Sequence, residues 1–308
     1  MIKLYRSLVI ISIFIFSSCG LVQKELNPFD PLHAYFDSSY DLVHADVPRG
    51  HMKRVMVPRP QIENEAIESF SKNIFCNDKE VGFERNRDQL ALYISAPYEH
   101  DEDIFSCHFR YSLKGDQEFY EYPFMQVLIS PYEFESERLN VDRRHVELSE
   151  EDLERWQNER KELERVYSEL EVDKSYFSKS FERPLNSVIT STYGRERVFN
   201  NDVSSWHNGI DFRAWYDTPI PSSNRGRVVF AGDLFFNGLT VIIDHGLGIV
   251  TLYCHLNELK VEVGDIVPQG HIIGLSGNTG RTTAPHLHWG VKVAGNWING
   301  FSLTDTNL

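Results

Sequence analysis

The chain has 308 residues and a formal net charge of −14, because 45 acidic residues outnumber 31 basic ones. Binding to duplex nucleic acid requires a basic surface, so this charge balance excludes a nucleic-acid partner. A chain of this length is typical of two domains with connecting segments.

Residues 1–19 have the pattern of an export signal. Lys3 and Arg6 precede an apolar run, Leu8–Phe16, that is shorter than the about 20 residues a membrane-spanning helix needs. The segment ends in Phe-Ser-Ser-Cys-Gly, which resembles a bacterial lipoprotein box with Cys19 as the lipidated residue. The alternative is an ordinary cleaved signal peptide. Both predict export, and Gly20 favours the outer membrane if the cell is Gram-negative.

Two regions of different character follow the export signal. Residues 20–60 show no clear periodicity and predict a tether that ends at Pro58 and Pro60. Residues 61–140 alternate apolar and polar positions, which predicts a small β-sandwich-like accessory domain. The alternating residues are Leu90, Leu92 and Ile94 in one run, and Phe105, Cys107, Phe109 and Tyr111 in another.

Cys76 and Cys107 are the cysteines of the accessory domain. An exported chain permits a disulfide between them. The alternative is two buried free thiols, because sequence spacing alone does not establish that two Cα atoms lie close together.

Residues 141–180 predict a helical linker, with the helix from Ser149 to Glu171. Ser149 can cap the helix, and Glu150 and Glu151 complement the helix dipole. An apolar stripe predicts packing against a neighbouring domain. The stripe comprises Leu153, Trp156, Leu163, Tyr167 and Leu170.

Residues 181–308 predict a compact, mainly antiparallel β-domain. Four runs rich in β-branched or aromatic residues are bounded by Gly, Asn or Asp. They are Val228–Gly232, Thr240–Asp244, Ile249–Tyr253 and Ile272–Ser276. The whole chain is therefore expected to be mainly β with one linking α-helix.

This C-terminal domain contains a set of residues typical of a metal site. His207 precedes Asp211 by four positions, and His255 ends a predicted strand. His286 and His288 share one strand face, because alternate strand residues point the same way. Two or three imidazoles with one carboxylate suit catalytic zinc better than Mg²⁺ or Ca²⁺. A single histidine of this kind is more often an ordinary surface or core residue, so the combination carries the prediction.

From about Phe181 to Phe301 the chain resembles the lysostaphin-type (LytM-like) zinc metallopeptidases, which cut peptide bonds in bacterial peptidoglycan. The resemblance covers some two fifths of the chain. Matching segments are Thr192–Gly194, the H-x3-D at His207–Asp211, Thr218–Pro221, Gly226–Val228, Ile243–Gly246, Tyr253–Leu256, Gly264–Gly270, Ile273–Gly277, Thr279–Gly280 and His286–His288.

Carried over by position, the resemblance implies that His207, Asp211 and His288 hold one zinc ion. It implies that His255 and His286 are the catalytic histidines in metal-assisted amide hydrolysis. One of the two could accept the proton of water, and either or both could stabilise the oxyanion. The sequence does not divide these roles.

Strand alternation predicts the surroundings of His255. Thr251, Tyr253 and His255 are expected on one face and Cys254 on the other. Cys254 stands where the family more often has a small residue. A thiolate could be a zinc ligand, whereas alternation favours a small buried apolar residue. His245 is expected to hydrogen-bond within the sheet.

The resulting functional hypothesis is an exported zinc endopeptidase that hydrolyses peptide cross-links or stem peptides of peptidoglycan. The protein is expected to be a monomer with a lipid anchor on Cys19. The alternative is a non-catalytic domain of the same fold that activates a cell-wall amidase. A third hypothesis is an enzyme that acts on host or prey peptides. The accessory domain, the Ser149–Glu171 helix, or both are hypothesised to pack against the C-terminal domain and restrict access to the metal site. The alternative is that they only space the enzyme from its membrane anchor.

Overall fold

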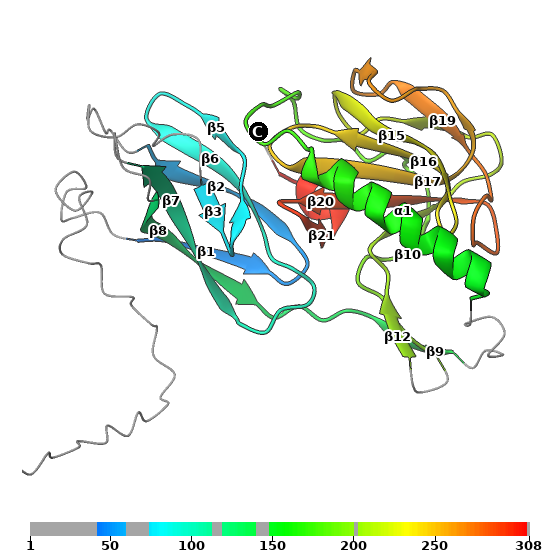
Figure 1. Ribbon diagram of the computed structural model, residues 1–308, viewed down its shortest axis with the longest axis horizontal. Helices are drawn as coiled ribbons and strands as arrows, with labels where there is room; N and C mark the ends of the chain where they lie inside the picture. Colours follow the sequence, from blue (N-terminus) through cyan, green and yellow to red (C-terminus); the bar gives the residue numbers. More distant parts are fainter. Residues whose placement is uncertain (1–41, 60–73, 113–118, 140–147, 200–202, 307–308) are drawn as a thin grey trace, which may run out of the picture. The chain divides into compact units, whose positions relative to one another are not determined.

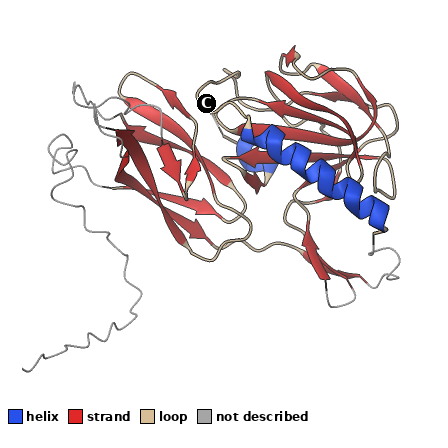
Figure 2. Cartoon of the chain, viewed as in Figure 1, coloured by secondary structure: helices blue, strands red, loops and turns tan. Residues whose placement is uncertain are grey.

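The computed structural model describes residues 42–59, 74–112, 119–139, 148–199 and 203–306. These residues are mainly β with two α-helices, which confirms the predicted fold class (Figures 1 and 2). The predicted export signal at residues 1–19, with Cys19, lies outside the described residues. In the parts of the chain that are described, no helix is long and apolar enough to span a membrane.

The accessory domain contains two β-sheets. The five-stranded sheet has the order β1 (Val43–Pro48), β8 (Phe119–Ser130), β7 (Ile104–Ser112), β3 (Ile74–Cys76) and β4 (Lys79–Glu80). The three-stranded sheet has the order β2 (Met52–Pro58), β6 (Gln89–Ser95) and β5 (Phe83–Arg85). The β1–β8 pair is parallel and the other pairs are antiparallel.

The predicted tether at residues 20–60 requires a correction. Its second half forms β1 and β2, so the accessory domain begins near residue 42 instead of residue 61. In β1, Ala45 and Val47 are buried while the residues between and beside them are not. This alternation spans too few residues, between polar neighbours, to stand out in the sequence.

Strand β6 of the accessory domain packs against the C-terminal domain. Its residues are buried on both faces from Leu90 to Ser95. The Tyr93 ring contacts Phe177 edge-on at 5.8 Å, and the Ser95 hydroxyl donates a hydrogen bond of 2.7 Å to the Val293 carbonyl. The predicted alternation of leucines therefore describes one face of β6, and its other face packs on the C-terminal domain.

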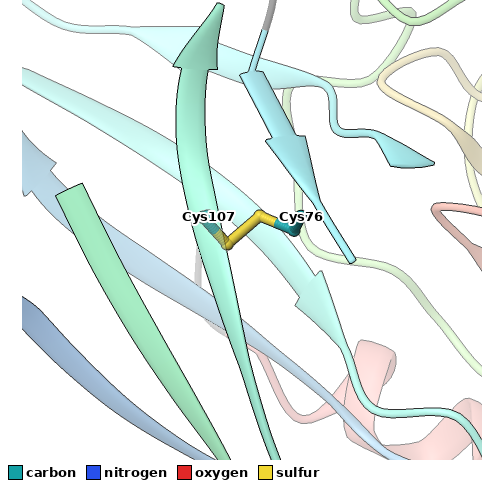
Figure 3. The surroundings of a disulfide bond; sticks show 2 residues. All are labelled: Cys76 and Cys107. Carbon is teal, nitrogen blue, oxygen red and sulfur yellow. A yellow bond between two sulfur atoms is a disulfide. The ribbon is translucent and has the colours of Figure 1, made fainter. Parts of the chain in front are cut away.

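Cys76 and Cys107 form a disulfide (Figure 3). They are register partners on the antiparallel strands β3 and β7, with Cα atoms 4.1 Å apart. Of the two interpretations left open by the sequence, the structure has the bonded one.

Helix α1 extends from Glu150 to Ser168, and Ser149 is its N-cap as predicted. The Ser149 hydroxyl accepts the Asp152 backbone N–H at 3.1 Å, and acidic residues fill the first turn. Leu163, Tyr167 and Leu170 of the predicted stripe pack against the C-terminal sheet. Leu153 remains 40% exposed, so the contact involves mainly the second half of the stripe.

The C-terminal domain is built on a sheet whose main path is antiparallel, as predicted. The path has the order β10 (Ile189–Ser191), β13 (Gly209–Arg213), β20 (His286–Val293), β17 (Ile249–Leu259), β16 (Gly238–Asp244), β15 (Gly226–Leu234) and β18 (Ile266–Val267). Off this path lie β14 (Pro219–Pro221), β19 (Ile272–Ser276) and β21 (Asn296–Ile298), and the short helix α2 (Gly300–Thr304) follows.

The two faces of this sheet bury different clusters. Tyr253, Leu287 and Trp289 belong to the large core cluster, whereas Leu252 and Cys254 belong to a smaller cluster beneath α1. Successive residues of β17 thus pack on opposite sides, as strand geometry requires.

A third small sheet connects the accessory region to the C-terminal domain. It has the order β12 (Val203–Trp206), β11 (Glu196–Phe199) and β9 (Ser136–Leu139). Strand β9 follows the accessory domain in the chain and pairs in parallel with β11. The β11–β12 pair precedes His207 in the chain, so β9 contacts the strands that lead to the predicted metal site.

The disulfide gives a prediction about stability. Replacing both Cys76 and Cys107 by alanine removes a cross-link with a sequence separation of 31 residues. In the chain-entropy model the free energy of unfolding falls by about 3–4 kcal/mol. Urea unfolding of the double variant measures the change, with Cys254→Ala as the control for a thiol outside the cross-link. An unchanged unfolding midpoint for the double variant would contradict the prediction.

Candidate metal centre

Two neighbouring strands position the predicted metal ligands Asp211 and His288. Strands β13 and β20 are antiparallel, and Asp211 is the register partner of His288. Because directly opposite residues point to the same face of a sheet, the carboxylate and the imidazole lie side by side. His207 lies between β12 and β13 and brings the third group.

The three ligand atoms converge on one point. His207 Nε2 lies 3.0 Å from Asp211 Oδ1 and 3.0 Å from His288 Nδ1, and His288 Nδ1 lies 2.9 Å from Asp211 Oδ1. Ligands on a tetrahedral zinc ion at about 2.0–2.1 Å are roughly 3.3 Å apart, so this spacing is close to that of three corners. Among the described residues this is the group of His, Cys, Asp or Glu side chains that could hold a metal ion.

The tautomer of His207 fits this role. Its Nδ1 lies 2.8 Å from the Thr192 carbonyl, which can only accept, so Nδ1 carries the proton. Nε2 is then the ring nitrogen that faces Asp211 and His288. A backbone carbonyl that fixes the tautomer of a ligating histidine is a common feature of metal sites.

The backbone of His207 is held by a segment that packs on the accessory region. The His207 N–H donates to the Arg195 carbonyl, and the His207 carbonyl accepts the Gly194 N–H at 2.7 Å. Gly194 has φ +78, and a Cβ there would lie 2.1 Å from the Phe134 ring. Arg195 forms an ion pair with Glu135. Phe134 and Glu135 therefore support the turn that carries this ligand.

His255 reaches the site through a β-bulge, not through regular alternation. Along β16 and β17, Val241 pairs with Tyr253 and Leu239 pairs with Leu256, so two residues of β17 oppose one residue of β16. His255 takes φ +60 in this bulge. The prediction that Thr251, Tyr253 and His255 share a face is therefore wrong, and Tyr253 is fully buried in the large core.

His255 and His286 lie together beside the three ligand candidates. Their ring centroids are 4.7 Å apart, and the His255 ring is 6.1 Å from that of His288. His255 Nδ1 donates to the Thr279 carbonyl at 2.9 Å, and His286 Nδ1 donates to the Ala284 carbonyl at 2.8 Å. Each ring therefore leaves its Nε2 atom free of these carbonyls, and His286 Nε2 lies 3.7 Å from Asp211 Oδ1.

The electrostatics favour an ionised carboxylate at Asp211 and neutral imidazoles at His255 and His288. Burial opposes ionisation of Asp211, but the interactions with His207 and His288 outweigh it, and the pKa of Asp211 lies well below its usual range. Burial lowers the pKa of His288. Burial also lowers the pKa of His255 to about 4, opposed by its bond to Thr279. Metal ligands must be deprotonated in this way.

A cavity of about 530 Å³ opens over these side chains. All five predicted site residues line it: His207, Asp211, His255, His286 and His288. The other lining residues also lie between Thr190 and His288. Among the described residues, the accessory domain and α1 thus contribute no part of the lining, and the hypothesis that they cover the site gains no support.

Cys254 and His245 are buried and do not line the cavity. Cys254 is fully buried in the cluster beneath α1, and burial raises the pKa of its thiol to about 12. His245 is fully buried, with Nδ1 donating to the Arg225 carbonyl and Nε2 2.7 Å from the Thr251 hydroxyl. Both match what the sequence led us to expect, a small buried residue and a hydrogen-bonded sheet residue.

Several site residues were not identified from the sequence. The carbonyls of Thr192 and Thr279 orient two histidines, and three arginines line the cavity. The segments Thr192–Gly194 and Thr279–Gly280 stand in the motifs noted above, which marked them without indicating a role. No sequence signal marks the arginines.

The comparisons with known proteins concern mainly this domain. Residues 205–300 match the model of Peptidase family M23. The peptidoglycan DD-endopeptidase ShyA of Vibrio cholerae is 44% identical over 93 residues, which are 30% of this chain and 22% of ShyA. The DD-carboxypeptidase/endopeptidase Mpg of Neisseria meningitidis is 39% identical over 97 residues, 32% of this chain and 22% of Mpg. The matches thus span about a fifth of each relative.

One solved structure resembles most of the chain. It is a crystal structure from Pseudomonas aeruginosa, titled as a peptidase of the M23 type, with a TM-score of 0.60 and 24% sequence identity. The alignment covers 84% of this chain and 94% of the other. At this identity the likeness concerns the fold, and its extent includes residues outside the M23 match.

The convergence of three ligand atoms predicts metal binding. Asp211→Ala or His207→Ala removes one of three protein ligands, so most of about one zinc ion per chain should be lost. Elemental analysis after dialysis measures the zinc content. Asp305→Ala, an exposed carboxylate of the same domain, is the control and should retain zinc. A fully zinc-loaded Asp211→Ala protein would show that the ligand assignment is wrong.

The support of the His207 turn gives a second prediction. Tyr98 of the accessory domain stacks on Trp206, the residue before His207, with ring centroids 4.3 Å apart. Such a ring pair contributes about 1 kcal/mol, so Tyr98→Ala should weaken zinc binding by about threefold to tenfold. Competition with a chelator measures the affinity. The control is Tyr120→Ala, which removes a stack with Tyr111 inside the accessory domain. Equal zinc affinity in both variants would exclude this support.

Proposed function

Residues 205–300 of the C-terminal domain match Peptidase family M23, and from that match we propose an exported, zinc-dependent endopeptidase that hydrolyses peptide cross-links or stem peptides of bacterial peptidoglycan. ShyA and Mpg, which match the same domain, are named for endopeptidase activity. We further propose that the protein acts as a monomer with a lipid anchor on Cys19.

The observation that carries this proposal is the convergence of five side chains at one cavity. His207, Asp211 and His288 are the proposed zinc ligands, since their ligand atoms lie within 4.8 Å of one another. His255 and His286 are the proposed catalytic residues, because both line the same cavity and each is held through Nδ1 by a backbone carbonyl. Three protein ligands leave a position open for reaction.

The proposed chemistry is hydrolysis of an amide bond. Bound zinc supplies Lewis acidity, which polarises a carbonyl and makes water more acidic. His255 and His286 can accept a proton at Nε2 while their Nδ1–H groups stay bound to the Thr279 and Ala284 carbonyls. Once protonated, either ring can donate a hydrogen bond to the oxyanion. The carbonyls hold both rings in position throughout.

The alternative of a non-catalytic amidase activator is less well supported. An activator has no need of two acid–base side chains next to three potential ligands, whereas this chain presents all five in one cavity. Incubation with purified sacculi tests the proposal, with released fragments identified by mass spectrometry. New fragments from cleaved peptide bonds support it. Intact sacculi in the presence of zinc-loaded protein would contradict it.

Replacement of a proposed catalytic histidine should separate binding from chemistry. His255→Ala should keep the fold and the zinc, yet reduce turnover of sacculi by roughly 10²–10⁴-fold, because an acid–base or oxyanion group is lost. The matched control is His271→Ala, an exposed histidine of the same domain, which should remain active. Loss of zinc from His255→Ala would mean that His255 is a ligand and that the proposed roles are misassigned.

A further inference from the structure

The charge of the cavity differs from that of the protein as a whole. The chain carries a net charge of −14. The cavity lining nevertheless contains three arginines, Arg197, Arg213 and Arg281, and one carboxylate, Asp211. Since Asp211 is already engaged by His207 and His288, the cavity has an excess of positive charge before any metal binds.

The three arginines come from separate elements around the histidines. Arg213 is the register partner of His286, one pair beyond Asp211 and His288 along the same face of β13 and β20. Two residues of a strand span about 7 Å, so the Cα atoms of Arg213 and Asp211 are about 7 Å apart. Arg197 lies on β11. Arg281 lies two residues after Thr279, and its guanidinium is 5.6 Å from the Phe236 ring centroid.

Nearby carboxylates do not neutralise these arginines. Glu135 pairs with Arg195, and Asp233 pairs with Arg155. In the part of the chain that the structure describes, none of the three cavity arginines has a carboxylate within ion-pair distance. Three arginines that line one cavity are therefore available to an anion from outside.

We propose that Arg197, Arg213 and Arg281 form a carboxylate-binding rim that selects peptides with a free carboxylate near the bond to be cut. Guanidinium groups bind carboxylates through paired, charge-assisted hydrogen bonds. Stem peptides that contain glutamate and diaminopimelate carry such groups, whereas amidated stems and glycine bridges lack them. The inference rests on the proposed function and specifies the substrate class of the same cavity.

The test uses two versions of one cross-linked muropeptide dimer, with its side carboxylates either free or converted to carboxamides. We expect the zinc-loaded wild type to cleave the free form with a kcat/KM about 10- to 100-fold higher, mainly through KM, as hydrogen bonds to a charged group contribute. Arg213→Gln and Arg281→Gln should lose most of this preference, because their kcat/KM for the free form falls more than their kcat/KM for the amidated form. Arg213→Lys and Arg281→Lys should keep part of the preference for the free form.

The control is Arg160→Gln, on α1 and paired with Glu164, which should keep the full preference. Zinc content and circular dichroism confirm that each variant is folded and loaded. If the wild type cleaves both dimers equally, or the variants lose activity equally on both, the rim is overturned while the proposed peptidase function stands. If the wild type cleaves neither dimer, the proposed function fails and this inference fails with it.

Discussion

The antiparallel pairing of β13 with β20 is the constraint on which the site depends. It sets Asp211 opposite His288 and Arg213 opposite His286, so one register decides four positions of the cavity. A slip by one residue would turn a whole strand's side chains to the other face. The register is protected because β20 lies between β13 and β17, and because Leu287 and Trp289, next to His288 in the chain, are buried in the large core. Burial of apolar residues on one face therefore fixes the polar residues on the other.

The sheet alone does not position His207 and His255, and each has a separate support. His255 stands at a bulge with φ +60, and its N–H donates to the Asn237 carbonyl while its ring donates to the Thr279 carbonyl. Gly238 and Gly280 allow these two loops to approach, because a Cβ on either would lie 2.3 Å from the other loop. His207 depends on the turn that packs on the accessory region. The accessory region thus supports the backbone of a proposed metal ligand and does not line the cavity.

The sequence predicted the metal group better than the surroundings of that group. The H-x3-D spacing and strand alternation marked a wider set of candidate residues, and the family resemblance selected His207, Asp211 and His288 from that set. Alternation failed at His255, because a bulge shifts the register by one residue and no glycine or proline marks it. The tether prediction failed in β1, whose partner β8 lies some 80 residues away, so its strand character arises from a pairing that local pattern does not contain. The sequence did not predict the cavity arginines for a similar reason, because they come from three separate segments and line one cavity only in the folded chain.

One face of the sheet serves two purposes, and β20 shows where they divide. His286 and His288 face the cavity, and further along the same face Lys292 lies under Tyr167 of α1, 3.9 Å from the ring centroid. Between them stands Gly290, where a Cβ would lie 2.9 Å from the Trp297 ring. Cys254, the register partner of His288, is at the boundary and belongs to the apolar cluster beneath the helix. The helix therefore excludes water from half of the face, and the half that it leaves open presents histidine, aspartate and arginine to a substrate.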